Sequence, residues 1–408
     1  MKIIVQKFGG SSVATAQQRE KVAGHIIRAV KEGLAVVVVV SAMGRAGDPY
    51  ATDTLINLIK RPGSGVGKRD MDLLMSCGEI ISTVILAQTL QNMGYPAVAL
   101  TGAQAGIITD DNFGDARIVE IKPDNILAQL ESGKIVIVAG FQGITTDGEV
   151  TTLGRGGSDT TAAALGVALH AEVVEVYTDV EGVMTADPRI VSEARTLSQV
   201  TYREVSEMAL LGAKVIHPRA VEIAMEDRVP LKVRCTFSEA PGTLIWDSPK
   251  GGIEIRGDRT VTGIAHIAGV AQVKVRSDRD FNTDGQSLKV FRPLAEAGIS
   301  LDLIQVTPEL ISFTMVEEKL EQTVKILTGL GFQVESTPGF AKVSAVGAGM
   351  HGVPGVMARI VEALVRAEVP IFQTTDSHTT ISCLVRRKDM EKAVQALHRQ
   401  FQLDNGDR

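Results

Sequence analysis

The stretch that decides the fold is Ile3–Lys31, IIVQKFGGSSVATAQQREKVAGHIIRAVK. The apolar run over Lys2–Gln6 predicts a strand, and the apolar spacing over Thr15–Lys31 predicts a helix. Between them lies the turn Lys7–Ser12, KFGGSS. Adjacent glycines let backbone N–H groups approach an anion, the start of a helix adds its positive end, and Lys7 adds a full charge. The turn therefore indicates either an anion site or a plain Gly-Gly turn with an exposed lysine.

The same alternation of strand and helix continues to about residue 250. Further strands are predicted at Ala35–Ser41, Ala97–Thr101, Lys134–Gly140 and Val173–Thr178. Further helices are predicted at Lys68–Asn92, Lys122–Glu131, Ser158–Leu169 and Tyr202–Leu211. This order is typical of an α/β domain with a mainly parallel sheet, which binds ligands at the carboxyl ends of its strands.

The bulk composition excludes several classes of protein. The chain has 408 residues, 44% hydrophobic and 22% charged, and a net charge of −6, which predicts more than one domain and no nucleic-acid partner. The three cysteines have no metal-binding spacing and are expected to be reduced thiols of a cytoplasmic protein. The apolar start is too short for a signal peptide, and the longest apolar run, Leu34–Val40, is too short to span a membrane.

An internal repeat occupies the C-terminal part of the chain. Ala271 aligns with Ala341 and Leu294 aligns with Leu364, both 70 residues apart, and the glycine pairs Gly269/Gly339 and Gly285/Gly355 keep the same offset. A constant offset over separate segments predicts two copies of one module, each reading strand, glycine turn, helix, strand, strand. The Gly-rich and charged stretch Asp247–Asp258 predicts a boundary before them.

Three further motifs offer polar groups near predicted strand ends, and each also has a purely structural interpretation. Thr152–Leu165, TLGRGGSDTTAAAL, places Ser158 as a helix N-cap and Asp159 in the first turn, but only Arg155 suggests a clamp for a carboxylate. Tyr177–Arg189, YTDVEGVMTADPR, is a strand end with either a ligand loop or a plain turn. Gly212–Glu222, GAKVIHPRAVE, offers Lys214 as a second cation or as a surface lysine.

Together with Ser41-Ala42-Met43 and the Ser76–Glu79 segment SCGE, these motifs resemble the aspartate kinases of the amino-acid kinase superfamily. The repeat resembles their paired ACT regulatory modules. The resemblance covers nearly the whole chain and is closest to the short Gram-positive enzymes, including the diaminopimelate-sensitive type. It implies a helix-sandwiched, mainly parallel α/β sheet over residues 1–245, a linker over 246–262, two α+β (βαββαβ) ACT modules over 263–335 and 336–403, and a disordered tail over 404–408.

The resemblance implies transfer of the γ-phosphoryl group of MgATP to the side-chain carboxylate of L-aspartate, giving 4-phospho-L-aspartate. This is the first step of lysine, diaminopimelate, threonine and methionine biosynthesis. Catalysis is assigned to Lys7, Asp159 and Lys214. Nucleotide binding is assigned to Lys7, Phe8, Gly9, Gly10, Ser41, Thr178, Asp179, Val183, Met184, Thr185, Ala186, Asp187, Pro188 and Lys214. Aspartate binding is assigned to Arg155, Gly156, Gly157 and Ser158, to Glu79 for the ammonium group, and to Thr52 or Asp53 in the loop after the second strand. No protein ligand of Mg²⁺ is assigned, so the phosphates and water are expected to hold it.

The ACT modules imply feedback inhibition by an amino acid and a homodimer or higher oligomer. In some relatives a shorter ACT-only chain also joins. Effector contacts are expected at His351, Gly352, Val353, Asp376, Ser377 and His378. The segments DLIQVTP (Asp302–Pro308) and DSHTTIS (Asp376–Ser382) depart from the lysine-plus-threonine pattern, so diaminopimelate is the first expectation and lysine, with or without threonine, the alternative.

Two other functions remain open from the sequence. One is another kinase of the superfamily, acting on a glutamate derivative, carbamate or a nucleotide, which Arg155 and Glu79 and the repeat argue against. The other is an amino-acid sensor without catalysis, which Lys7, Asp159 and Lys214 argue against.

Overall fold

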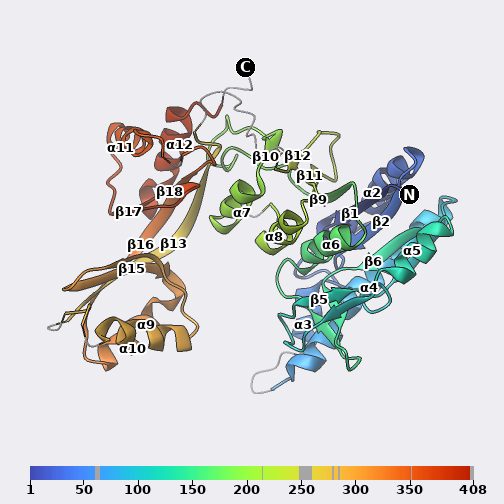
Figure 1. Ribbon diagram of the computed structural model, residues 1–408, viewed down its shortest axis with the longest axis horizontal. Helices are drawn as coiled ribbons and strands as arrows, with labels where there is room; N and C mark the ends of the chain where they lie inside the picture. The colour runs from blue at the N-terminus through green and yellow to red at the C-terminus, as the bar shows by residue number, and fades with distance from the viewer. Residues whose placement is uncertain are drawn as a thin grey trace. The chain divides into compact units, whose positions relative to one another are not determined.

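The computed structural model describes residues 1–59, 65–213, 215–247, 260–277, 280–283, 285–350 and 352–404. The chain forms two compact units, whose elements are labelled in Figure 1. The first unit takes in Met1–Val183, Thr196–Ala209 and Lys214–Glu254, and the second takes in Met184–Arg195, Leu210–Ala213 and Ile255–Arg408.

An eight-stranded sheet forms the centre of the first unit, in the order β10-β12-β11-β9-β1-β2-β6-β3. All neighbouring strands run parallel except β11 and β12, which are antiparallel. The central strands are Val- and Ile-rich and buried, as expected for strands covered on both faces. The bounds are β1 Ile3–Phe8, β2 Ala35–Val40, β3 Ala97–Leu100, β6 Ile135–Ala139, β9 Val173–Thr178, β10 Gln199–Val200, β11 Leu231–Cys235 and β12 Thr243–Ile245.

Helices cover both faces of this sheet. On one face α2 (Ala16–Lys31) and α4 (Lys68–Asn92) bury apolar side chains against Ile4, Val36, Val38 and Ile137. Helix α6 (Gly157–Ala168) contacts β1, β2 and β9, and Gly166 packs on Val174, whose side chain faces the other way along its strand. The remaining helices of this unit are α1 Gly10–Val13, α3 Thr52–Ile59, α5 Asp124–Glu131, α7 Tyr202–Leu210 and α8 Pro218–Glu226.

A smaller sheet of four strands, in the order β5-β4-β7-β8, completes the first unit. Its strands are β4 Ile107–Thr109, β5 Ile118–Ile121, β7 Gln142–Ile144 and β8 Val150–Thr152. Strand β8 leads directly into the glycine-rich segment before α6, so this sheet fixes the entry to that helix.

The predicted mainly parallel sheet between helices is confirmed, and most predicted elements lie within two residues of the observed ones. Helix α2 begins behind a capping box, in which Gln18 N donates to Thr15 Oγ1 and Gln18 accepts from the Thr15 backbone. Helix α5 begins at Asp124 rather than Lys122, because Pro123 occupies its N-cap position. Helix α6 begins at Gly157 with Gly156 as N-cap, so the prediction that Ser158 caps it is wrong.

Within the described part of the chain, α4 is the one helix long and apolar enough to cross a membrane. This is weak evidence for a span, because the core helix of a soluble protein passes the same test. Helix α4 packs against β3, β6 and β8 and buries the polar side chains of Asp72 and Glu79.

The second unit contains a six-stranded antiparallel sheet in the order β14-β15-β13-β16-β18-β17. Every element of its first half recurs about 70 residues later, which confirms the predicted repeat. The elements are β13 Gly263–Arg276, α9 Gln286–Glu296, β14 Asp302–Val306, β15 Leu310–Val316, α10 Leu320–Gly329, β16 Gln333–Val346, α11 Val356–Arg366, β17 Gln373–Asp376, β18 Thr380–Arg386 and α12 Met390–Gln400, with short 3-10 helices at Glu317–Lys319 and Arg387–Asp389.

Strands β13 and β16 join the two repeats. The first half of β13 pairs with the second half of β16, and the second half of β13 pairs with β15 and the first half of β16. Gly269 and Gly339 have φ of 72° and 78°, which favours glycine at both bends. Both long strands are continuous, and β16 runs through the predicted module boundary between residues 335 and 336. The predicted linker lies largely outside the described residues, as does the predicted tail apart from Asp404.

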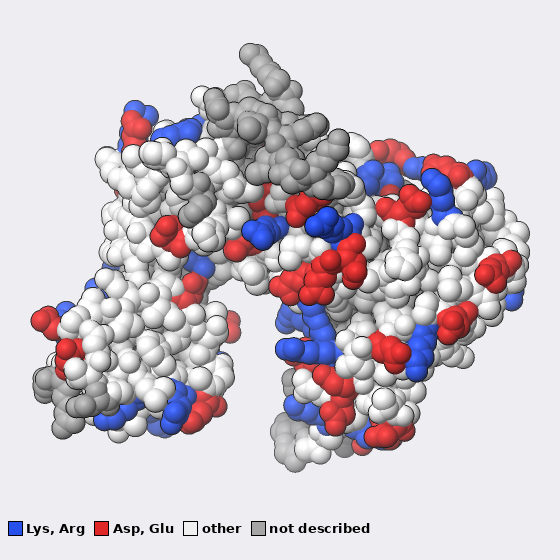
Figure 2. All heavy atoms as spheres, viewed as in Figure 1, with Lys and Arg blue, Asp and Glu red and all other residues white. Residues whose placement is uncertain are grey.

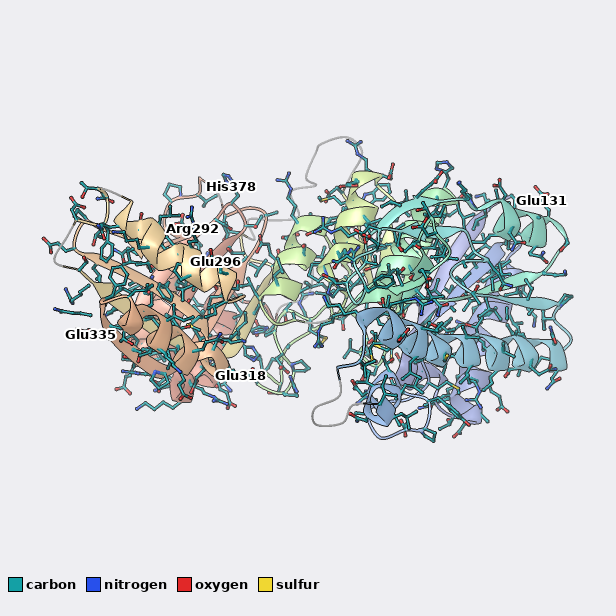
Figure 3. All side chains as sticks on the ribbon, turned by 90° about the horizontal axis from the view of Figure 1, so that it is seen from below. Glu131, Arg292, Glu296, Glu318, Glu335 and His378 are labelled. Carbon is teal, nitrogen blue, oxygen red and sulfur yellow. The ribbon has the colours of Figure 1, made fainter. Side chains whose placement is uncertain are left out.

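The face of the molecule seen in Figure 2 carries charges of both signs. In the view of Figure 2, acidic and basic side chains intermingle on each unit. Figure 3 shows Arg292 and Glu296 on α9 and Glu131 at the end of α5, and all three side chains are exposed.

Candidate active site

The carboxyl end of β1 carries a nearly buried ion pair. Lys7 Nζ lies 2.6 Å from Asp159 Oδ1, and each side chain is only 13% exposed. Lys7 comes from β1 and Asp159 from the first turn of α6, as the sequence predicted for that turn. A carboxylate this close holds the ammonium group in one position, so the pair presents an oriented positive charge at the strand end.

The glycines after Lys7 allow the chain to pack closely. A Cβ on Gly10 would lie 2.4 Å from the Ala42 carbonyl oxygen and 2.7 Å from that of Gly44, so no other residue fits there without a shift of the backbone. Gly44 N donates to the Gly10 carbonyl at 3.0 Å. Gly9 caps the short helix α1, and a Cβ there would lie 3.7 Å from Lys7 Nζ. The turn is therefore fastened to the loop that follows β2.

The start of α6 brings several predicted acceptor-binding residues together. Gly156 is left-handed, with φ of 71°, and Gly157 packs against Phe141 and Leu153. The buried Ser158 hydroxyl accepts a hydrogen bond from Ser41 Oγ at 3.0 Å, which links the ends of β2 and α6. Arg155 is exposed before the helix and forms no ion pair with a described residue. Its charge is thus available beside the helix N-terminus.

Glu79 on α4 is a buried carboxyl with one unused oxygen. It is 2% exposed, and its Oε1 accepts from Ala42 N at 3.1 Å. Its Oε2 is buried and has no hydrogen-bond partner among the described residues. Burial raises the pKa of Glu79 to about 8, although the backbone hydrogen bonds oppose this shift. A cationic group of a ligand would provide the missing hydrogen-bond partner for Glu79 Oε2.

The loop after β2 differs from the prediction. Thr52 and Asp53 were expected in that loop, but they form the first turn of α3, with Thr52 partly buried and Asp53 exposed. The apolar residues Leu55 and Ile59 are four positions apart, which is a helical spacing. This spacing was the signal in the sequence that would have predicted a helix here instead of a loop.

The end of β9 carries the first nucleotide-binding candidates. Thr178 Oγ1 donates to Asp179 Oδ1 at 3.1 Å, and Asp179 Oδ2 pairs with Arg45 at 2.7 Å. Val183 N donates to the Thr243 hydroxyl at 2.9 Å. Phe8 is fully buried and stacks on Tyr177, so only its backbone faces the turn.

The remaining nucleotide candidates, Met184–Pro188, belong to the second unit. The Thr185 hydroxyl accepts from Arg195 N at 3.1 Å and shares a 2.9 Å hydrogen bond with His398 Nε2 of α12. Ala186 packs in the apolar core of the second unit, and Asp187 pairs with Arg189, which lowers the pKa of Asp187. The Thr185 backbone is also paired, since its N–H donates to the Arg195 carbonyl at 2.9 Å and its carbonyl accepts from Ile264 N at 2.8 Å. Neither the side chain nor the backbone of Thr185 is therefore free for a ligand.

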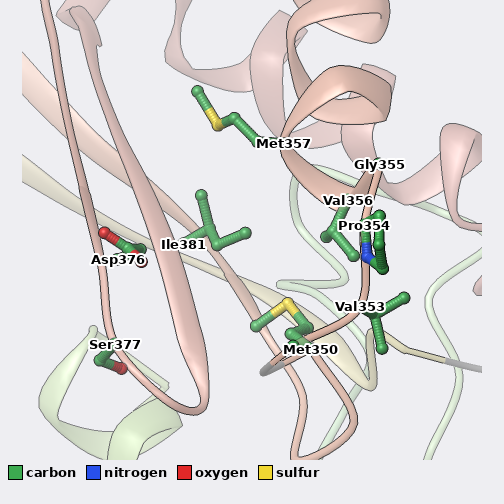
Figure 4. Close-up of a pocket in the computed structure, with 10 residues that line it drawn as sticks. Met350, Val353, Pro354, Gly355, Val356, Met357, Asp376, Ser377 and Ile381 are labelled. Atoms are coloured by element: carbon green, nitrogen blue, oxygen red, sulfur yellow. The ribbon is translucent and has the colours of Figure 1, made fainter.

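A pocket of about 370 Å³ in the second unit gathers most of the predicted effector contacts (Figure 4). It lies between the glycine turn before α11 and the end of β17. Gly352, Val353, Asp376 and Ser377 line it together with Met350, Pro354, Gly355, Val356, Met357 and Ile381. His378 follows Ser377 but does not line the pocket. His351 and the catalytic candidate Lys214 lie outside the described residues.

Sequence reasoning missed two residues of the site. Arg45 holds Asp179, and the His217 backbone N–H donates to Asp159 Oδ2 at 3.3 Å. His217 stands in the motif GAKVIHPRAVE, of which only Lys214 was interpreted as a site residue. Arg45 lies in the loop after β2, where an arginine among glycines gave no periodic signal.

Comparisons with known proteins cover the whole chain. The Amino acid kinase family matches residues 2–235 and the ACT domain matches residues 335–399. The chain is 51% identical to Aspartokinase 1 of Bacillus subtilis (strain 168), over 99% of this chain and 100% of that protein. Aspartokinase III of E. coli solved with aspartate and ADP (R-state) superimposes with a TM-score of 0.78 at 26% identity, covering 98% of this chain and 99% of that one. The same enzyme solved with lysine and aspartate (T-state) gives 0.80 at 27% identity, covering 98% and 100%.

Proposed function

The chain belongs to the aspartokinases, kinases that combine an amino acid kinase region with ACT domains, and from this premise we propose how its residues divide the work. The reaction is transfer of the γ-phosphoryl group of MgATP to the side-chain carboxylate of L-aspartate, giving 4-phospho-L-aspartate. The observation that carries the proposal is the nearly buried Lys7–Asp159 pair at the end of β1.

The chemical problem is electrostatic. The acceptor carboxylate, with a pKa of about 4, is already ionised at neutral pH, so no general base is required. An anion must instead approach a polyanion. Lys7 and the backbone of Gly9 and Gly10 stabilise the charge that spreads over the transferring group. Asp159 orients Lys7 and removes no proton, and Lys214 assists from the nucleotide side.

Aspartate is held at the start of α6. Arg155, the Gly156 and Gly157 backbone and Ser158 receive its carboxylates, because a helix N-terminus and a guanidinium both favour anions. Glu79 receives its ammonium group, which would complete the unused Oε2. Thr52 or Asp53, at the start of α3, provides a further polar contact.

The nucleotide is assigned to Phe8, Ser41, Thr178, Asp179 and the segment Val183–Pro188. What supports this is the resemblance and the ADP in the E. coli aspartokinase III structure. Mg²⁺ enters with ATP as part of the substrate and offsets phosphate charge. We assign this ion to the phosphates and water, without a protein ligand.

The pocket beside α11 is assigned to an amino-acid effector. The start of α11 suits a carboxylate, and Asp376 suits an ammonium group. For the identity of the effector, the resemblance to the diaminopimelate-sensitive type supports meso-diaminopimelate. The lysine in an E. coli aspartokinase III structure supports lysine, with or without threonine, as the alternative. An effector inhibits only if it binds one conformation better than another.

Three further assignments rest on the resemblance. The chain assembles as at least a homodimer through its ACT modules, with or without a shorter ACT-only chain. It acts in the cytoplasm, with which three free cysteines agree. Its product feeds lysine, diaminopimelate, threonine and methionine biosynthesis.

The test is ATP-dependent phosphorylation of aspartate, trapped as the hydroxamate, with glutamate as control substrate and Lys7→Met as control enzyme. The assay is repeated with diaminopimelate, lysine, threonine, and lysine plus threonine. Aspartate-specific turnover that diaminopimelate alone abolishes would support both the reaction and the effector. Turnover that only lysine inhibits would keep the reaction and make lysine, not diaminopimelate, the effector. A folded, ATP-binding chain without turnover would indicate an amino-acid sensor.

A further inference from the structure

His217 makes two separate contacts with the start of α6. It occupies the N-cap position of α8, and its imidazole lies against the Gly156 backbone. A Cβ on Gly156 would come within 2.2 Å of His217 Cγ, 2.4 Å of Cδ2 and 2.5 Å of Cβ. The ring therefore fills the space over the left-handed turn that carries Arg155 and leads to Ser158.

The second contact comes from the backbone of the same residue. His217 N donates to Asp159 Oδ2 at 3.3 Å, while Asp159 Oδ1 faces Lys7 at 2.6 Å. The two oxygens of Asp159 are thus divided between the Lys7 ammonium group and the start of α8. The ring and the backbone of His217 serve different halves of the site.

Arg219 reinforces this arrangement from the first turn of α8. Its guanidinium donates to the Leu153 carbonyl at 3.1 Å and to the Ala116 carbonyl at 3.0 Å. Leu153 lies between β8 and Gly156 in the chain. The start of α8 therefore contacts the loop on both sides of Arg155, through Arg219 at Leu153 and through His217 at Gly156. One helix start thereby fixes the whole segment from Leu153 to Asp159.

We propose that His217 is a positioning residue for aspartate, whose imidazole holds the Arg155–Ser158 turn in its binding geometry. The proposal rests on the proposed function, because it assigns aspartate to that turn. A ring that packs on the turn affects how well the turn binds. The backbone N–H, which any residue but proline retains, serves Asp159 and hence the phosphoryl half of the site. Loss of the ring alone should therefore change KM for aspartate and leave kcat nearly unchanged.

The test variant is His217→Asn, because asparagine is a good N-cap residue and keeps the N–H to Asp159. The matched control is His170→Asn, at an exposed residue with φ of 49° just after the other end of α6, where asparagine is tolerated. The variant His217→Phe restores a flat ring without imidazole nitrogens. Each protein is assayed for kcat and for KM of aspartate and ATP, and its aspartate Kd is measured by titration calorimetry.

We expect His217→Asn to raise KM and Kd for aspartate about 10-fold, with kcat and KM for ATP within about 2-fold of the parent, as when binding that is equal in the ground state and the transition state is lost. His217→Phe should recover most of the loss, and His170→Asn should show none. An unchanged KM in His217→Asn, or a His217→Phe variant as impaired as His217→Asn, would overturn the proposal. If His217→Asn does not fold, His217→Phe is compared with the parent instead. A similar KM for aspartate would support the proposal, and a KM raised about 10-fold would overturn it. A parent without any aspartokinase turnover would instead contradict the proposed function.

Discussion

Replacement of Glu79 by glutamine should separate its charge from its shape. Glutamine keeps the acceptor for Ala42 N and loses only the ability to ionise. Burial raises the pKa of Glu79 to about 8, so at pH 7 only about a tenth of the unliganded protein carries the carboxylate. An ammonium group binds the ionised form. Aspartate binding should therefore weaken as the pH falls below 8.

The size of this effect follows from the titration. The ionised fraction falls from about one half at pH 8 to about one hundredth at pH 6, which weakens aspartate binding about 50-fold in the parent protein. At pH 7 binding should release about 0.9 proton, because the bound state requires the carboxylate. In Glu79→Gln both effects should disappear. Its affinity at pH 8 should be about 30-fold lower or worse, as when one partner of a buried charge pair is removed.

The assay is titration calorimetry of aspartate at pH 6, 7, 8 and 9, in buffers of different ionisation enthalpy that report proton release. The control is Glu131→Gln, the same substitution at an exposed position at the end of α5 (Figure 3). A parent affinity that stays constant from pH 6 to 8 without proton release would refute the reasoning. So would a Glu79→Gln protein that binds aspartate as tightly as the parent at pH 8.

The same shift predicts a change in stability. The folded pKa of Glu79 lies above its ordinary value of 4.5, so the folded state retains a proton that the unfolded chain loses as the pH rises. Stability is therefore lost between pH 4.5 and 8, at about 1.4 kcal/mol per pH unit, or about 3 kcal/mol by pH 7. Glu79→Gln should be more stable than the parent to chemical denaturation at pH 8 and similar near pH 4.5. Equal stabilities at both pH values would contradict this account.

Four shorter predictions concern the catalytic turn, helix α2 and the second unit. Asp159→Asn should lower kcat about 100-fold while KM for aspartate changes little, since Lys7 loses the charge that orients it; a kcat within 3-fold of the parent would count against the role of the pair. Gly10→Ala should lower the free energy of unfolding by about 2 kcal/mol or more, because its Cβ would lie 2.4 Å from a carbonyl oxygen. Gly24→Ala inside α2, with open space around it, should raise that free energy by up to about 1 kcal/mol. Burial lowers the pKa of His398, so its own contribution to the free energy of unfolding should fall as the pH drops below 6.5, opposite in sign to that of Glu79, and His398→Gln should remove this contribution from denaturation curves.

The local patterns in the sequence were sufficient to predict most of the first unit. The bounds predicted for α4, Lys68–Asn92, are those observed, because this long, largely apolar segment has no proline and lies between Gly67 and Gly94. The repeat could also be recognised from the sequence. The glycine pairs at its turns adopt the left-handed conformation in both copies, which favours glycine at the same positions of each copy. Strand ends and helix starts are marked by turn-forming residues such as glycine, so their positions can be predicted from a single sequence.

Long-range pairing is where the sequence was insufficient. The repeat suggested two modules in succession, whereas strand pairing couples the first half of β13 with the second half of β16. Neither the grouping of Met184–Arg195 with the second unit nor the contact of Thr185 with His398 has a local signature. The pairing of Lys7 with Asp159 has no local signature either, because the two residues lie in separate motifs.

The glycine-rich motifs also have a packing explanation, in addition to the anion site that the sequence offered. Gly10 lies against two carbonyl oxygens, a Cβ on Gly140 would come within 2.8 Å of Ser158 Oγ, and Gly156 lies against the His217 ring. These glycines would be required for packing even in a chain that bound no phosphate.

The motifs therefore cannot by themselves distinguish a kinase from an amino-acid sensor that keeps the fold. Glu79 does not distinguish them either, because any binder of an amino acid benefits from a buried carboxylate. The distinction falls on Lys7 and Asp159. Holding a charge pair at 13% exposure contributes little to stability, since desolvation offsets the attraction. A sensor would gain little from the pair, whereas phosphoryl transfer requires an oriented cation where the negative charge develops.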